Sequence, residues 1–139
     1  MFQIKNTILI IVVLCMSFSF KAQAQEIIGD GFRPDVNKIE DYFEKAFEGR
    51  DHNGLGEGGR AFYGDVFENR LVIGKLEEDP DSYTNLSEMP AYNEALRSRD
   101  RSNPKNFNPF NYKLDYFNEK EDVFYKVYDT EYFVFIKKR

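Results

Sequence analysis

The closing stretch of the chain, from Phe107 to Ile136, alternates between polar and apolar residues. We predict that this stretch is the scaffold of the fold. Within it, residues 112–117, 123–128 and 132–136 alternate or run apolar over strand lengths, and turn-type residues separate them. The last segment is apolar on both faces, which is typical of a strand inside a sheet rather than at its edge. The pattern predicts a three-stranded antiparallel meander at the C-terminus.

Two helices and a hairpin are predicted before the meander. Apolar residues recur at helical spacing between a proline and a glycine, which predicts a helix over residues 34–48. Residues 61–76 have the pattern of two short strands joined in a hairpin. Ser87 is a suitable cap for a shorter helix over residues 88–98. Together these elements predict an α+β fold: a small, mainly antiparallel sheet, made of the meander plus the hairpin and covered by one or two helices.

The remaining segments are predicted to be irregular. Residues 50–59 are rich in glycine and read as a flexible linker, with a lid or binding loop as the functional alternative. Residues 77–84 form an acidic, turn-rich connection, which is more typical of a solvated loop than of a calcium site. Residues 102–111, rich in proline and asparagine, are expected to bridge into the meander with Phe107 and Phe110 tucked in as anchors.

The start of the chain has the arrangement of a secretory signal peptide. An apolar run from Ile8 to Phe20 precedes the small-residue motif Ala22-Gln23-Ala24, which is typical of a cleavage site. The run is shorter than the roughly 20 residues that a transmembrane helix needs, so no transmembrane segment is expected after cleavage. We therefore expect residues 1–24 to be removed and residues 25–139 to form a single α+β domain.

Composition and charge restrict the classes of partner. Cys15, the single cysteine, lies in the predicted signal, so the mature chain is expected to have no disulfide and no thiolate metal site. The whole chain has a formal net charge of −5, and loss of Lys5 and Lys21 makes the mature chain more acidic. Because phosphate binding needs a basic surface, nucleic acid is not an expected partner. An exported domain without cysteine favours a bacterial envelope, with a periplasmic or extracellular location.

No motif of the chain is a catalytic signature. His52 is the only histidine, so a second imidazole for zinc is missing. The surrounding stretch imitates part of a calcium loop, but Gly49 and Arg60 stand where the first and last carboxylate ligands belong. A pair of carboxylates for glycoside hydrolysis has no local spacing by which it could be recognised. We expect a protein that is not an enzyme, with no cofactor and no metal.

Two groups of polar residues are candidate binding residues. One lies in and just after the glycine-rich segment, and the other is the only basic cluster of an acidic molecule. The basic cluster has two interpretations: it is a site for an anionic partner, or its cations only stabilise the C-terminus of a helix. The candidates are Asp51, His52, Asn53, Glu57 and Arg60 in the first group, and Arg97, Arg99 and Arg101 in the second.

Protein–protein interaction is the expected function, with another envelope or extracellular protein as the partner of an exported, non-catalytic protein. Most aromatic residues are expected in the core, and a minority could form an exposed recognition platform. The alternative is a small-ligand module for carbohydrate, lipid or peptide, which needs a groove between residues 34–48 and the sheet. A small hydrolase is a third possibility and needs His52 or two carboxylates to converge in a cleft.

Overall fold

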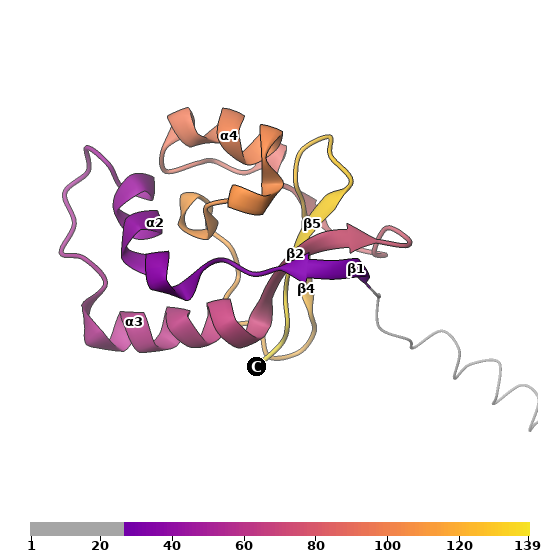
Figure 1. Cartoon of the computed structure of the whole chain (residues 1–139), viewed down its shortest axis with the longest axis horizontal. Helices are drawn as coiled ribbons and strands as arrows, with labels where there is room; N and C mark the ends of the chain where they lie inside the picture. The colour runs from indigo at the N-terminus through magenta and orange to yellow at the C-terminus, as the bar shows by residue number, and fades with distance from the viewer. Residues whose placement is uncertain (1–26) are drawn as a thin grey trace, which may run out of the picture.

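Residues 27–139, which the computed structural model describes, form a five-stranded sheet with helices on one side (Figure 1). The main elements are β1 (Ile27–Phe32), α2 (Ile39–Ala46), α3 (Gly56–Asp65), β2 (Leu71–Leu76), β3 (Thr84–Asn85), α4 (Arg97–Ser102), β4 (Val123–Lys126) and β5 (Tyr132–Ile136). The strand order is β1-β2-β5-β4-β3, and neighbours are antiparallel except β3, which runs parallel to β4. The α+β class with a small, mainly antiparallel sheet is confirmed. The predicted signal peptide, residues 1–24, lies outside the described residues.

β5 lies at the centre of the sheet, as its apolar sequence predicted. It pairs with β2 on one side and with β4 on the other. Val134 and Ile136 belong to the core under the helices and are fully buried. Phe133 and Phe135 occupy the opposite face and are only 2% and 7% exposed. Burial on both faces explains why this strand has no polar position.

β1 forms the edge of the sheet next to β2. Its pairing shifts between Ile28 and Phe32, and Gly29 within this bulge has a φ of 71°, which glycine adopts without strain. Gly74 in β2 gives room for Ile27, because a Cβ at that glycine would lie 2.7 Å from Ile27 Cγ2. The bulge and the missing side chain together let the edge strand close over the sheet.

The core lies between the sheet and the helices, and aromatic side chains fill much of it. The helix predicted over residues 34–48 is confirmed as a 3₁₀ turn followed by α2, which buries Ile39 and Ala46. The bridge between α4 and β4 is anchored as predicted, because Phe107 and Phe110 are 1% and 6% exposed. One cluster of buried residues therefore joins both helical and sheet segments.

The predicted hairpin over residues 61–76 is wrong in its first half. α3 occupies that position, and a π-helical turn, Val66–Arg70, leads into β2, which is confirmed as a strand. Tyr63 and Phe67 stand four residues apart, so the apolar positions of this stretch also fit one helical face. The predicted glycine-rich loop accordingly ends at Leu55, and its last glycines form the first turn of α3.

The predicted strand over residues 112–117 has the expected alternation but no place in the sheet. Its even-numbered residues, Tyr112, Leu114 and Tyr116, are buried, and its odd-numbered residues, Lys113, Asp115 and Phe117, are exposed. The backbone turns on itself, since the Tyr112 carbonyl accepts a 3.0 Å hydrogen bond from the Leu114 N–H. The Asp115 carboxylate similarly accepts a 3.1 Å bond from the Phe117 N–H. Only two of the three meander strands, β4 and β5, therefore form.

The second helix begins later than the predicted range of residues 88–98. Asn85 and Asn93, rather than Ser87, accept the capping hydrogen bonds, and each asparagine opens a single 3₁₀ turn. Pro90 stands between the two turns and disfavours helical backbone in the residue before it. A continuous helix thus starts only with α4.

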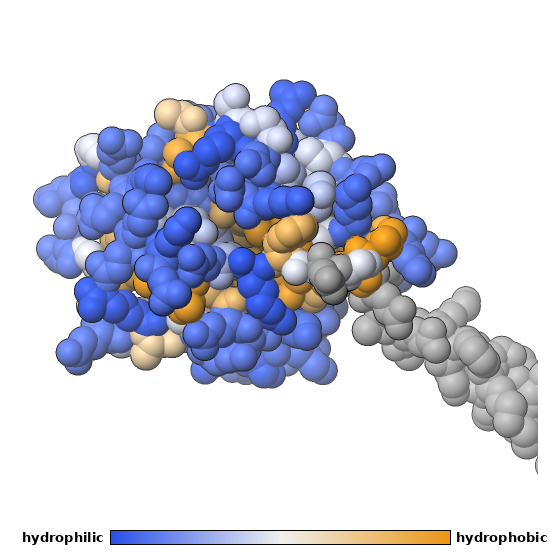
Figure 2. All heavy atoms as spheres, viewed as in Figure 1, coloured by the Kyte–Doolittle hydropathy of each residue, from blue (hydrophilic) through white to orange (hydrophobic). Residues whose placement is uncertain are grey.

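The face seen in Figure 2 is mostly hydrophilic, with hydrophobic residues gathered over β1. The large apolar side chains with the greatest exposure are Phe117 at 61%, Ile28 at 53% and Tyr83 at 42%. The acidic connection is solvated as predicted, because every residue from 77 to 83 except Pro80 is exposed. None of the described helices is long and apolar enough to cross a membrane.

Candidate functional site

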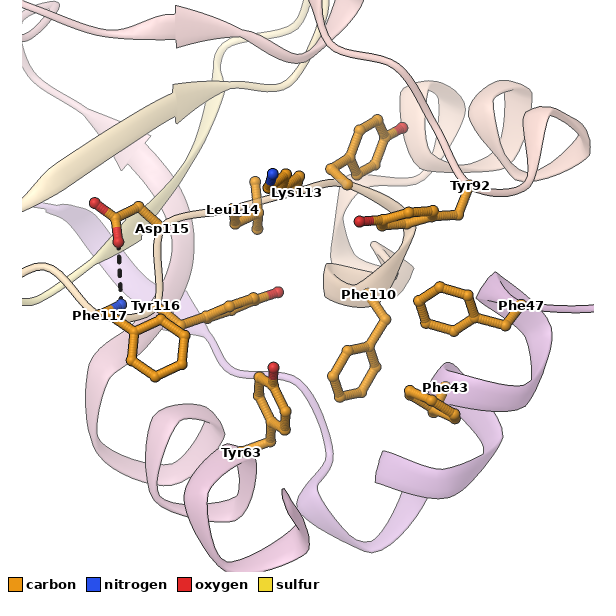
Figure 3. A pocket seen from close by; sticks show the side chains of 11 residues that line it. Phe43, Phe47, Tyr63, Tyr92, Phe110, Lys113, Leu114, Asp115, Tyr116 and Phe117 are labelled. Atoms are coloured by element: carbon orange, nitrogen blue, oxygen red, sulfur yellow. Dashed lines mark hydrogen bonds between the residues drawn. The ribbon is translucent and has the colours of Figure 1, made fainter. Parts of the chain in front are cut away.

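An aromatic groove opens between α2, α3 and the irregular segment 110–117. Its volume is about 460 Å³. It runs from Phe117 at one end to Phe47 at the other, with rings from all three segments between them (Figure 3). We define the aromatic groove by its eleven lining residues: Phe43, Phe47, Tyr63, Tyr92, Phe110, Tyr112, Lys113, Leu114, Asp115, Tyr116 and Phe117.

The rings of the aromatic groove hold one another in edge-to-face contacts. Phe110 meets Phe43 with centroids 5.6 Å apart and Tyr63 with centroids 5.0 Å apart, both nearly perpendicular. Tyr63 also contacts Tyr116 at 5.3 Å and 85°. This is a preferred geometry for aromatic pairs, so contacts among their own side chains hold the groove walls in place.

Three phenol hydroxyls point into the middle of the aromatic groove, those of Tyr63, Tyr92 and Tyr116 (Figure 3). The Tyr116 hydroxyl donates a 2.7 Å hydrogen bond to the Pro109 carbonyl. Burial raises the pKa of Tyr63, and the nearby Tyr92 raises it further. Tyr63 is therefore uncharged at neutral pH, and the three hydroxyls form a polar centre between apolar walls.

Charged groups lie at the rim of the aromatic groove. Lys113 and Asp115 project from its irregular wall, and both are exposed. At the other end, the Arg50 guanidinium lies 5.7 Å from the centre of the Tyr92 ring. The exposed Phe117 ring stacks on Phe62 of α3 at 4.8 Å. The rim thus combines a flat apolar surface with charges of both signs.

Arg70 fixes the wall that carries Tyr116 and Phe117. Its side chain donates hydrogen bonds to the Tyr116 carbonyl (2.7 Å), to Asn118 Oδ1 (3.1 Å) and to the Lys137 carbonyl (3.0 Å). Arg70 is only 7% exposed, and burial lowers the pKa of its guanidinium. A buried cation that satisfies three acceptors links this wall to the end of β5.

Asp100 organises the other end of the same irregular segment from a fully buried position. Its carboxylate accepts hydrogen bonds from the Asn108 N–H (3.2 Å), the Asn111 amide (3.4 Å) and the Tyr112 hydroxyl (3.0 Å). The Tyr112 and Tyr128 hydroxyls are 2.9 Å apart. Burial raises the pKa of Asp100, although these three donors act in the opposite direction.

The candidate residues of the first group lie outside the lining of the aromatic groove. His52 packs edge-on against Phe43, with centroids 5.2 Å apart, and its Nε2 lies 3.5 Å from a Glu44 carboxylate oxygen. Arg60 forms an ion pair with Glu40. The others, Asp51, Asn53 and Glu57, are exposed. Of these candidates, only His52 therefore contacts rings of the groove, those of Phe43 and Phe47.

The arginines of the second group are separated by their contacts. Arg97 donates to the Tyr128 hydroxyl (3.0 Å) and to the Met89 carbonyl, so it supports the network of Asp100. Arg101 forms two hydrogen bonds with the exposed Asp129 carboxylate. Arg99 Nε is buried and has no hydrogen-bond partner within residues 27–139. The cluster is not a single basic surface.

The groove residues were missed as a site by sequence reasoning. Their signal was the high aromatic content of 17%, which core packing explains equally well. Across the described part of the chain, no group of three or more His, Asp or Glu residues could hold a metal ion. Comparison of this chain with protein-family models, with curated proteins and with solved structures found no significant match.

Proposed function

We propose that this protein is an exported, non-catalytic binding protein, which recognises another protein of the cell envelope or the extracellular space through the aromatic groove. The observation that carries the proposal is the groove itself, with pre-arranged rings around three phenols. Tyrosine and other large aromatic residues are enriched among residues that dominate binding energy at protein interfaces. Phe117 extends this surface because its ring is 61% exposed at the rim.

An affinity pull-down tests the proposal. The protein, produced from the full-length sequence so that any export and cleavage take place, is tagged at the C-terminus and used to capture proteins from envelope and culture fractions of its own host. We expect one envelope or extracellular protein in near-stoichiometric amount. Intact mass of the same preparation tests export, because cleavage after Ala24 removes residues 1–24.

Two single substitutions connect capture to the groove. Phe117→Ala removes an exposed ring of the aromatic groove, and we expect it to weaken binding about tenfold or more. Tyr83→Ala is the matched control, because Tyr83 is also an exposed aromatic residue but packs on Phe133 on the opposite face of the sheet, with centroids 5.4 Å apart. Equal loss of the partner in both variants, or in neither, would contradict the groove as the site.

A small-ligand module is the second candidate, and one observation favours it. The volume of about 460 Å³ falls within the range of about 300–1,000 Å³ that is typical of small-molecule sites. A pull-down without any captured protein, together with thermal stabilisation by a compound from a carbohydrate, lipid or peptide screen, would favour this candidate over protein binding.

A further inference from the structure

We infer that the middle of the aromatic groove accepts a tyrosine side chain of the partner protein, with its phenol among the three groove hydroxyls. This inference rests on the proposed function and specifies the chemistry by which the partner is recognised. It starts from the hydroxyls of Tyr63, Tyr92 and Tyr116, which come from three separate segments and point into one space (Figure 3).

The hydrogen-bonding capacity of these hydroxyls matches a group that both donates and accepts. The Tyr116 proton is committed to the Pro109 carbonyl, so the Tyr116 oxygen remains available as an acceptor. No hydrogen bond joins the Tyr63 or the Tyr92 hydroxyl to another of the lining residues drawn in Figure 3, so both can donate to a guest oxygen. A phenol supplies one donor hydrogen and one acceptor oxygen, which satisfies both requirements.

The walls select an aromatic ring around that polar group. Phe110 already contacts Phe43 and Tyr63 edge to face, and a guest ring would continue the same arrangement. An aliphatic guest would cover the three hydroxyls without offering them a partner, which costs free energy. A sugar would bring several hydroxyl groups against walls that consist mainly of carbon, and most of these groups would lose their hydrogen bonds to water.

NMR titration of the isotope-labelled protein with p-cresol and with toluene tests the inference. The first probe is the tyrosine side chain itself, and the second lacks only the hydroxyl. We expect both to shift the amide signals of Phe110 and Tyr116, with millimolar affinity for p-cresol and about fivefold weaker affinity for toluene, as the loss of one net hydrogen bond implies.

The double variant Tyr63→Phe/Tyr92→Phe keeps both rings and removes the two donor hydroxyls but leaves the Tyr116 acceptor. We expect it to lose most of the fivefold preference for p-cresol. Tyr83→Phe, outside the groove, should keep the fivefold difference. Equal affinity of the two probes for the unmodified protein would overturn the inference, as would the absence of any shift in the groove.

The two proposals fail in different ways. If Phe117→Ala abolishes capture of a partner protein but the groove shows no preference for p-cresol over toluene, the proposed function stands and the inference of a bound tyrosine side chain is refuted. A preference for p-cresol without any captured protein would overturn the protein partner and assign the groove to a free phenolic compound. A captured protein whose binding p-cresol weakens, with toluene less effective, would support both.

Discussion

Replacing Arg70 with methionine tests whether one buried cation holds the wall of the aromatic groove in place. The guanidinium donates to the Tyr116 carbonyl and to Asn118 Oδ1 in buried surroundings, and to the Lys137 carbonyl in a partly buried bond. Methionine fills much of the same apolar space but donates no hydrogen bond. The substitution therefore isolates the contribution of the donors from that of the packing.

The magnitude follows from the acceptors left behind. A buried acceptor that loses its donor costs about 1–3 kcal/mol, and Arg70→Met leaves two of them, the Tyr116 carbonyl and Asn118 Oδ1. Part of this cost is offset, because the variant no longer has to bury a charged group, the same effect that lowers the pKa of Arg70. We expect a net loss of about 2–4 kcal/mol, which is a large share of the roughly 5–15 kcal/mol that stabilises a typical domain.

Urea unfolding followed by circular dichroism measures this loss as a lower midpoint with an unchanged slope. The matched control is Arg101→Met, which breaks an exposed pair with Asp129 and should cost at most about 1 kcal/mol. Arg70→Lys should lie between the two, because an ammonium keeps the charge but cannot reach three acceptors in the same fork. A stability of Arg70→Met within about 0.5 kcal/mol of the unmodified protein would refute the role assigned to the guanidinium.

Three further substitutions or truncations have defined outcomes. Arg97→Gln should lower the free energy of unfolding by about 1–3 kcal/mol, because it removes partly buried donors, whereas Arg101→Gln breaks only an exposed pair and should cost less. Equal effects of the two substitutions on urea unfolding would contradict this difference. Asp100→Asn should destabilise the protein less, relative to the unmodified protein, as pH rises. Folding raises the pKa of Asp100, so between the pKa values of the unfolded and the folded state the folded protein binds an extra proton. The stability of the unmodified protein therefore falls as pH rises through this range, whereas asparagine does not titrate. Urea titrations of both proteins across acid pH check this sign, and a stability difference independent of pH would disprove it. Deletion of residues 132–139 should abolish cooperative melting, because it removes the strand paired on both sides, and a sharp thermal transition in the truncated protein would be inconsistent with the sheet order.

The fold was predictable from sequence where a pattern had one physical solution. The run 132–136 had no polar residue, so only a doubly buried strand suited it, and β5 is that strand. The pattern of residues 61–67 is compatible with two structures, because its apolar residues fit either a pair of short strands or one face of a helix. The helix forms because Tyr63 and Phe67 then meet Phe110 in the core, a contact between distant segments that periodicity cannot reveal.

The site was less predictable than the fold. Sequence reasoning selected polar residues in the glycine-rich segment and the arginine cluster, because charge and unusual composition are visible locally. The aromatic groove depends instead on Tyr63, Tyr92 and Tyr116, whose side chains line one space only after α3 and the irregular segments have packed. In a chain with 17% aromatic residues, nothing in the local sequence distinguishes a groove tyrosine from a core tyrosine.

The position of β5 in the sheet has a consequence for the order in which the molecule can assemble. β2 and β4, each of which pairs with β5, have no ladder with each other, because β5 separates them in the strand order. A growing polypeptide therefore cannot complete its sheet until residues 132–136 have left the ribosome. Helical turns near α2 and α3 can form earlier from local contacts, but closing the sheet requires contacts between residues far apart in sequence, which slows the rate-limiting step. Until residues 132–136 are available, the aromatic residues of the core lack the central strand against which they pack.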